Sequence, residues 1–226
     1  MIILQQIHQV IGEREFDFEE TFRDALLRPD FDSKVKLLWF AWSSHGTGEG
    51  YEALSVIGFR DLSTWNELDE RTRYGDLASW ATAIDGMRYS LHSTLNRVPD
   101  WSPTIHIELS GAGPKASPHE PSQLRLDTVS FGPDVDDGSK RVCDAAAESS
   151  GDLLELIGCW IDYFGNAGSG LGHFLSRIRV SQALSDELDN EAVTARWAGS
   201  PSVLGRLPRS LIRSRFLRTV PWSPLS

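Results

Sequence analysis

The feature that most constrains the fold of this chain is an internal duplication. Its last residues, Val220-Pro221-Trp222-Ser223-Pro224, repeat a segment from the middle of the chain, Val98-Pro99-Asp100-Trp101-Ser102-Pro103. A constant offset of 120 also aligns 39–69 with 159–189, and each of these stretches contains a glycine-rich turn. Because similar sequences fold alike, the chain is predicted to contain the same structural unit twice.

Hydrophobic periodicity predicts the elements of the first copy. Alternating or continuous runs of apolar residues indicate strands, whereas apolar residues three and four positions apart indicate helices. The helix that begins near Trp65 has an apolar stripe that continues to Met87, with a break expected at Gly75. The predicted order is a strand at 2–11, a helix at 17–27, strands at 35–42 and 51–60, a helix at 65–90 and a strand at 91–98.

The second copy is predicted to repeat this order. Its elements are a strand at 122–131, a helix at 138–147, strands at 152–164 and 171–180, a helix at 181–188, a further helical piece after Pro201, and a strand at 211–220. Each copy is therefore a β-α-β-β-α-β unit, which is the ferredoxin-like order. One such unit leaves one face of its sheet bare, and the other copy can cover it. The predicted fold class is α+β: a tandem duplication of a ferredoxin-like unit that forms a single-chain, pseudo-dimeric α+β barrel.

The boundary between the copies is expected in a stretch rich in Gly, Pro and Ser. We place the first ferredoxin-like repeat at 1–106, a linker at 107–121 and the second repeat at 122–226. A short apolar run at 105–109, which overlaps the start of the linker, is predicted to be strand-like.

Charge and composition argue against two classes of partner. The formal net charge is −10, whereas binding to nucleic acid requires concentrated Lys and Arg. The Arg-rich run at 206–218 is interpreted as a solvated face. No apolar run approaches the ~20 residues that span a bilayer, and the N-terminus carries no targeting segment. We therefore expect a cytoplasmic protein with no nucleic-acid or membrane partner, as a monomer or a homodimer of pseudo-dimers.

The cysteines and histidines do not indicate a metal site. Cys143 lies on a predicted helix and Cys159 on a predicted buried strand, and both are interpreted as small apolar thiols rather than as a disulfide or metal pair. The 6 histidines lack close ligand spacing, so no protein-bound metal is predicted.

The glycine-rich loop at 43–50 holds a candidate catalytic group. His45 titrates near neutral pH and has no histidine counterpart in the second copy, so it is the candidate general base. Tyr51 is the candidate residue to orient or donate to a substrate oxygen. Trp39 and Trp42, on the preceding strand, are candidate walls of an apolar substrate pocket. The alternatives are an exposed turn histidine and aromatic residues that belong to the core.

Charged side chains inside the strands of the second copy form another candidate site. Asp162, His173 and Arg177 fall within predicted strands, where an unpaired buried charge costs several kcal/mol. We interpret them as the polar, substrate-binding end of a ligand cavity. The alternatives are a solvated outer face or a structural ion pair, in which Arg177 or Arg179 pairs with Asp127 or Asp162.

The order of elements and the local sequence of the first copy resemble those of a known superfamily. The residues concerned are Leu37-Leu38-Trp39-Phe40-Ala41-Trp42 with His45-Gly46-Thr47-Gly48, then Arg60-Asp61 and Gly75-Asp76-Leu77. The chain resembles a fused version of the dimeric α+β barrel superfamily, which includes the antibiotic-biosynthesis monooxygenases, the polyketide cyclases and the NIPSNAP-type proteins. The resemblance covers nearly the whole length.

This resemblance implies a fold and a type of binding cavity, but it identifies no catalytic residue in this chain. It implies a cavity for a flat apolar molecule, between the sheets or between sheet and helices. It also implies that the extra strand after Trp101-Ser102-Pro103 exchanges with the other half of the barrel. No cofactor is expected, although haem held by one histidine stays open because haem-binding relatives exist in the superfamily.

Three hypotheses for function follow. The leading one is a cofactor-independent enzyme, a monooxygenase or a cyclase/isomerase, that acts on an apolar aromatic or terpenoid-like small molecule of secondary metabolism. The second is a non-catalytic binding or carrier protein with the same cavity, and the third is a structural dimerisation domain with no cavity. Converging acid and base groups in the interior would favour the enzyme, whereas a uniformly apolar cavity would favour the carrier.

Overall fold

The computed structural model describes residues 1–26, 34–44, 50–111, 118–148, 154–163, 170–178 and 211–225. Several expectations fall outside these residues: the catalytic candidate His45, the ion-pair candidate Arg179, the helix at 181–188 and the helical piece after Pro201.

The first repeat has the predicted order of elements. They are β1 (Ile2–Val10), α1 (Glu15–Leu26), β2 (Val35–Ser43), β3 (Glu52–Phe59), α2 (Leu62–Tyr74), α3 (Ala78–Asp85) and β4 (Arg88–Arg97). The predicted helix at 65–90 is two helices, and the break lies at Gly75 as expected. A Cβ atom at Gly75 would lie 2.9 Å from the backbone of Arg71, so a larger residue does not fit at this turn.

The described elements of the second repeat follow the same order. They are β5 (Gln123–Ser130), α4 (Val135–Glu148), β6 (Leu154–Asp162), β7 (Leu171–Ile178) and β8 (Leu211–Thr219), with a 3₁₀ turn η3 (Gly132–Asp134) before α4.

The predicted strand at 105–109 is wrong. The segment between the repeats forms two 3₁₀ helices, η1 (Pro103–His106) and η2 (Leu109–Gly111). Pro103 stands at the start of η1, and the Ser102 side chain accepts a hydrogen bond from Thr104 N at 3.2 Å. A proline and a capping serine favour a helical turn over an extended strand.

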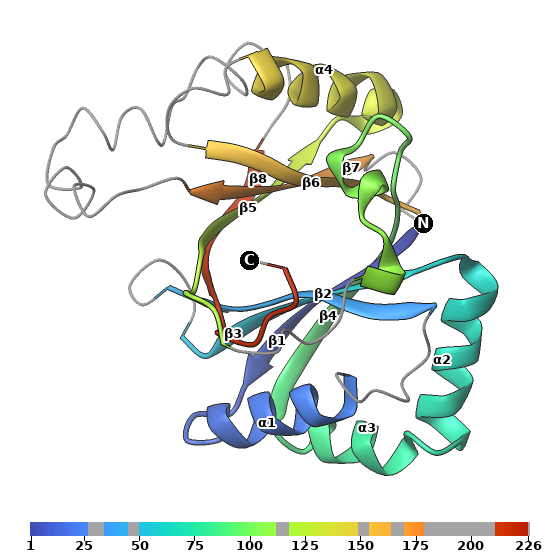
Figure 1. Ribbon diagram of the computed structural model, residues 1–226, viewed down its shortest axis with the longest axis vertical. Coiled ribbons are helices and arrows are strands. Elements are labelled where there is room, and N and C mark those ends of the chain that lie inside the picture. Colours follow the sequence, from blue (N-terminus) through green and yellow to red (C-terminus); the bar gives the residue numbers. More distant parts are fainter. Residues whose placement is uncertain are drawn as a thin grey trace, which may run out of the picture.

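The described strands close into one antiparallel barrel with the order β1-β3-β2-β8-β5-β7-β6-β4. Each repeat contributes four neighbouring strands, and the repeats join at two seams, β2 with β8 and β4 with β6. Figure 1 shows the two sheets facing each other, with α1, α2 and α3 covering the outer face of the first and α4 covering the second. The predicted single-chain α+β barrel is confirmed.

The two repeats correspond with small shifts that a single offset of 120 does not capture. A β-bulge lies between Leu37 and Trp39 in β2, and its counterpart lies between Leu156 and Gly158 in β6, an offset of 119. The same offset relates β3 to β7, and an offset of 121 then relates β1 to β5. The expected match of Trp39 with Cys159 is therefore wrong, and the counterpart of Cys159 is Phe40.

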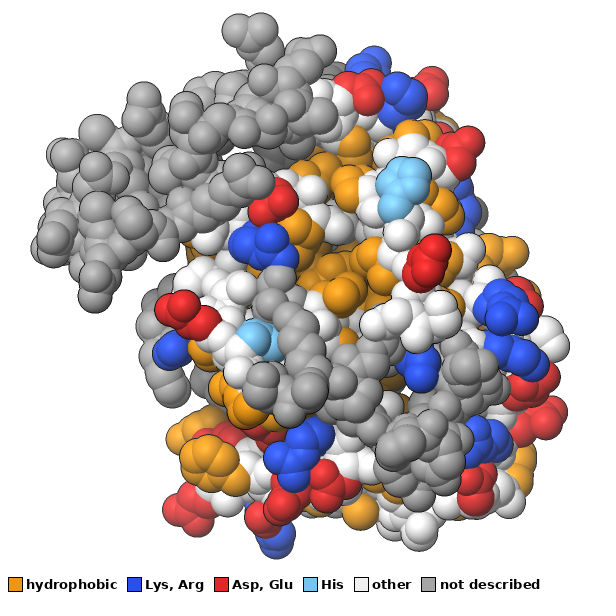
Figure 2. Space-filling view, viewed as in Figure 1, with side chains coloured by type: hydrophobic (Ala, Val, Ile, Leu, Met, Phe, Trp, Pro, Cys, Tyr) orange, Lys and Arg blue, Asp and Glu red, His pale blue; other side chains and the backbone are white. Residues whose placement is uncertain are grey.

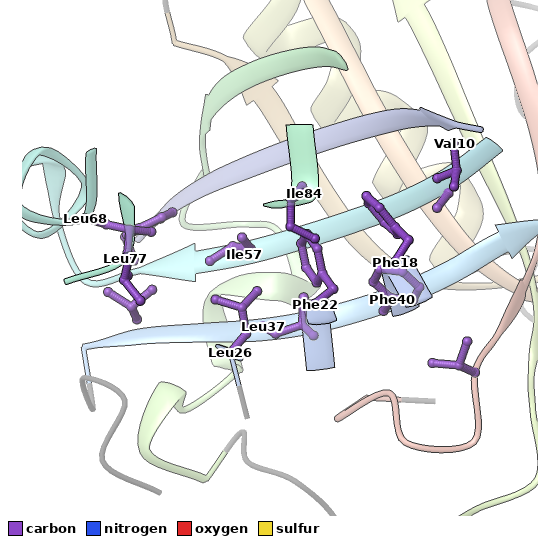
Figure 3. Packing of buried hydrophobic residues seen from close by; sticks show 14 of the residues in the cluster. Val10, Phe18, Phe22, Leu26, Leu37, Phe40, Ile57, Leu68, Leu77 and Ile84 are labelled. Atoms are coloured by element: carbon purple, nitrogen blue, oxygen red, sulfur yellow. The ribbon is translucent and has the colours of Figure 1, made fainter. Parts of the chain in front are cut away.

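The layer between the first sheet and its helices is aromatic. Phe18 and Phe22 of α1 point toward Phe40 of β2, and the ring centroids of Phe22 and Phe40 are 5.2 Å apart. Figure 3 shows Ile84 of α3 and Leu77 joining the same cluster. Burial of these large side chains holds the helices on the sheet.

The barrel interior is a second apolar cluster, made by residues of both repeats. Trp39 of β2 and Trp160 of β6 stack at its centre with ring centroids 6.3 Å apart, and both are almost completely buried. Figure 2 shows hydrophobic side chains at the centre of the face that looks onto the space between the two sheets. These contacts make the two repeats one packing unit.

The repeated Trp-Ser-Pro segments contact the other repeat, but no strand is exchanged after the first of them, where the resemblance implied one and η1 and η2 lie instead. Ser102, which follows the last strand of the first repeat, donates to Cys159 O of β6 at 2.6 Å. Ser223, which follows the last strand of the second repeat, accepts from Phe40 N of β2 at 3.1 Å. Both serines are fully buried. Phe40 and Cys159 are counterparts, so the two contacts lie at corresponding positions, although one serine donates to a carbonyl and the other accepts from an amide. Within the described residues, no helix is long and apolar enough to cross a membrane.

Candidate functional site

A group of polar side chains lies inside the barrel beside the seam between β4 and β6. We call it the seam cluster, and its members are Gln5, Thr94, Asn96, Thr128, Asp162 and His173. They come from the adjacent strands β1, β4, β6, β7 and β5. Four of them, Gln5, Asn96, Thr128 and His173, are less than 9% exposed. The cluster therefore places hydrogen-bonding groups in an otherwise apolar interior.

His173 is the centre of the seam cluster. Its Nε2 lies 2.9 Å from Asp162 Oδ1, and its Nδ1 lies 3.1 Å from Thr128 Oγ1. An ionised carboxylate only accepts hydrogen bonds, so we assign the ring proton of the neutral imidazole to Nε2. Nδ1 is then the acceptor for the Thr128 hydroxyl. The result is a hydroxyl, an imidazole and a carboxylate linked in series.

Strand alternation and pairing place these groups together. Successive side chains of a strand point to opposite faces, so His173 shares the interior face of β7 with Leu175, which belongs to the interior cluster. In the register of the sheet, His173 is opposite Thr128 on one side and Trp160 on the other. Asp162 follows Trp160 by two positions and therefore points to the same face.

Asn96 and Trp39 carry polar atoms without a partner in the described structure. Asn96 is the cross-strand partner of Asp162, and its Nδ2 donates to Thr94 O at 2.9 Å, but its buried Oδ1 accepts no hydrogen bond. Trp39 Nε1 is also buried and donates to no group. The neighbouring indole is satisfied, since Trp160 Nε1 donates to Gln5 Oε1 at 2.8 Å. One unused acceptor and one unused donor thus line the interior.

The first repeat does not reproduce this arrangement. The counterparts of His173, Thr128 and Asp162 are Leu54, Ile7 and Ser43. At the opposite seam, the buried carboxylate of Glu52 instead pairs with Arg215 at 2.8 Å. The two seams have therefore diverged. One carries the hydrogen-bonded series of Thr128, His173 and Asp162, and the other carries the ion pair of Glu52 with Arg215.

A second buried histidine, His8, lies between the first sheet and its helices. Its Nε2 is 2.9 Å from Ser55 Oγ, and its Nδ1 is 2.8 Å from the Arg88 guanidinium. Burial, and then the charge of Arg88, hold the pKa of His8 well below its usual value. A guanidinium only donates, so the imidazole is neutral with its proton on Nε2. Phe18 and Phe22 pack edge-on against the ring, which makes His8 part of the core.

The structure separates the residues proposed for the mouth of the first repeat. Tyr51 is half exposed with a φ of 60°, and its ring lies against Gly12. Trp42 points toward α1, where its Nε1 donates to Glu19 Oε2 at 2.8 Å. Trp39 points into the barrel. His45 lies outside the described residues, so its role stays a prediction.

The proposed ion pairs of Arg177 are wrong. Arg177 pairs with Glu155 at 3.1 Å, whereas Asp162 pairs with His173 and Asp127 pairs with Arg125 at 2.9 Å. Glu155 and Arg177 are opposite each other in the register of β6 and β7, and this direct cross-strand position decides the pairing.

Sequence reasoning identified Asp162 and His173 but missed Thr128, Asn96 and Gln5. A threonine in a strand is an ordinary residue, and only the register with β7 shows that Thr128 faces His173. Asn96 and Gln5 could have been found as amide side chains on the interior-facing positions of predicted strands, since such positions are usually apolar.

The described residues fit neither a metal ion nor a haem held by one histidine. Among them, no group of three or more His, Cys, Asp and Glu side chains is placed to hold a metal. Three described histidines, His8, His119 and His173, have both ring nitrogens in hydrogen bonds with protein groups. His92 and His106 are exposed. None of these five presents a free nitrogen in a buried pocket.

Comparison with known proteins gives a fold. No protein-family model and no curated protein sequence matches the chain. The solved structure of an anthrone oxidase-like protein matches with a TM-score of 0.58 and 10% identity, over 97% of this chain and 91% of that one. A protein of Lactobacillus acidophilus named as a monooxygenase matches with a TM-score of 0.54 and 10% identity, over 97% and 93%. A protein named as a chlorite dismutase matches with a TM-score of 0.52 and 11% identity, over 99% and 97%. This chain has the fold of the dimeric α+β barrel superfamily, with both halves of the barrel supplied by one polypeptide.

Proposed function

We propose that the chain is a cofactor-independent oxidative enzyme of the monooxygenase kind that acts on an apolar aromatic small molecule. The observation that carries the proposal is the series of hydrogen bonds from Thr128 through His173 to Asp162 beside an apolar barrel interior. Removal of a proton from a substrate requires such a set, whereas a carrier with a uniformly apolar interior does not.

The proposed first step is proton transfer. The Thr128 hydroxyl takes the substrate proton and passes its own to His173 Nδ1, while the Asp162 carboxylate stabilises the imidazolium at Nε2. The electron pair of the broken bond stays on the substrate as an aromatic anion, which O₂ then oxidises. The unused indole N–H of Trp39 is a suitable donor for the substrate oxygen on which the negative charge collects.

The name of the anthrone oxidase-like neighbour suggests the probe. Anthrone and O₂ give anthraquinone and water, a balanced reaction that begins with loss of a proton from the carbon opposite the carbonyl. Oxygen uptake and anthraquinone absorbance report turnover together. Substrate turnover without oxygen uptake would instead indicate an isomerase or cyclase, and binding without product would indicate the carrier.

Substitutions in the relay test the assignment. His173→Gln should lower the rate of oxygen uptake about 10²–10⁴-fold, and Asp162→Asn and Thr128→Val should also lower it. His92→Gln is the matched control, because His92 is an exposed histidine of β4. Near-UV circular dichroism checks that each variant is folded. A folded His173→Gln protein with an unchanged rate would overturn the proposal, and His45 would become the next residue to test.

A further inference from the structure

We propose that Cys143 and Cys159 form a modification site, at which a peroxide oxidant joins α4 to β6 through an intramolecular disulfide. The two cysteines are free thiols, buried at 7% and 0% exposure in the apolar cluster under α4. The proposal is independent of the proposed enzymatic function.

The duplication indicates that these two residues face each other, and both belong to the same buried cluster. Cys159 is the counterpart of Phe40 in β2. With the offset of 121 that relates the preceding strands β1 and β5, Cys143 is the counterpart of Phe22 in α1. Phe22 and Phe40 pack directly against each other across the helix–strand interface. The second repeat has therefore replaced a pair of contacting aromatic rings by a pair of thiols.

The helix of the second repeat also lies close to its sheet. A Cβ atom at Gly172 of β7 would lie only 2.5 Å from Ser139 Oγ, one turn of α4 before Cys143. The counterparts in the first repeat are the larger Ala53 and Phe18. Close approach compensates for the smaller side chains, since a disulfide requires Cα atoms within about 7 Å.

Cys143 also affects the pKa of the Cys159 thiol. Burial, and then a hydrogen bond with the Cys143 side chain, raise the pKa of the Cys159 thiol. Both thiols belong to one buried cluster, and a disulfide would bring their sulfur atoms to about 2.05 Å.

The chemistry is balanced with hydrogen peroxide as the oxidant. Cys143, the more exposed thiol, is oxidised to a sulfenic acid while the peroxide is reduced and releases one water. Cys159 sulfur then attacks Cys143 sulfur, the S–O bond breaks, and the sulfenic oxygen leaves as a second water with the Cys159 proton. The sum is two thiols and one peroxide giving one disulfide and two waters.

The test treats the full-length protein with hydrogen peroxide under native conditions. The expected result is a monomer with a mass lower by about 2 Da, the loss of two hydrogens, with both thiols absent on titration in denaturant and one peptide pair linking residues 143 and 159. Peptide mapping distinguishes oxygen added at methionine from changes at the cysteines. Oxidised methionine also shows that the peroxide was active.

Cys143→Ser and Cys159→Ser are the matched variants. Neither should form a cross-linked peptide. Cys143→Ser should keep its one titratable thiol, whereas Cys159→Ser should hold Cys143 as a sulfenic acid with no second thiol to resolve it. Circular dichroism checks the folds of both variants. The proposal is overturned if the wild-type thiols both survive while methionine is oxidised, if each forms a separate sulfinic acid, or if the cross-link joins two chains.

Discussion

Trp222 donates its indole N–H to Glu19 Oε1 at 2.6 Å, so the last turn of the chain is fastened to the first helix. Trp42 Nε1 donates to the other oxygen of the same carboxylate at 2.8 Å. A C-terminal segment of the second half of the barrel is thus held on the first half by the same carboxylate that binds Trp42. Hydrogen bonds to an ionised carboxylate are stronger than neutral ones.

Removal of this carboxylate should destabilise the protein. Glu19→Ala leaves two partly buried indole N–H groups without their acceptor, and the expected loss in free energy of unfolding is about 1–3 kcal/mol. Glu20→Ala is the control, because Glu20 is 68% exposed and its ion pair within the described residues is with the surface residue Arg23 at 3.4 Å. Its loss should be within ~0.5 kcal/mol. Urea melts compare the two variants. Equal losses in free energy of unfolding would show that the hydrogen bonds of Glu19 with Trp42 and Trp222 do not contribute to stability.

The two arginine pairs of the second repeat should differ in their contribution to stability. Arg125 and Asp127 have side chains only 7% and 9% exposed, so Arg125→Ala leaves a buried carboxylate without its partner and should cost about 3–5 kcal/mol. Arg177 and Glu155 are each 33% exposed, and solvent screening limits the effect of Arg177→Ala to about 1 kcal/mol. Denaturant melts of both variants check the order, and a larger loss for Arg177→Ala would contradict it.

The first repeat alone should not be a stable monomer. Residues 1–106 would expose Trp39 and the rest of the interior cluster, and would lack the contacts of Ser223 and Trp222 with β2 and α1. A large exposed apolar face favours association. We expect aggregation or self-dimerisation in analytical ultracentrifugation. A monomer with native-like near-UV circular dichroism would show that the repeats fold independently.

The barrel could be predicted from the sequence because the Trp-Ser-Pro motif and the order of elements both occur twice, which indicates two copies of one unit. Which side chains contact each other inside the barrel could not be predicted. A bulge inserts one residue between Leu156 and Gly158, and each such residue moves every later side chain of the strand to the other face. Nothing in the sequence marks this bulge, so strand alternation suggested that Asp162 and His173 are polar interior residues but could not show that they touch.

The environment of His8 should make stability depend on pH in a defined window. The folded pKa lies below that of the unfolded chain, which is about 6.5. The neutral form is therefore favoured by folding, and its contribution is complete above pH ~6.5. As the pH falls toward the folded pKa, the unfolded chain binds a proton that the folded protein does not. Stability should then fall by up to about 1.4 kcal/mol per pH unit.

A variant without the titrating ring isolates this contribution. His8→Gln keeps hydrogen-bonding capacity toward Ser55 and Arg88 but cannot bind a proton in this range. Urea melts between pH 5 and 7 should show a smaller slope of unfolding free energy against pH in His8→Gln than in the wild type, whereas the exposed-site control His92→Gln should keep the wild-type slope. Equal slopes in all three proteins would mean that His8 takes up a proton in the folded state as readily as in the unfolded one. The guanidinium of Arg88 at 2.8 Å argues against that result, because a protonated imidazole would place two positive donors face to face in a buried site.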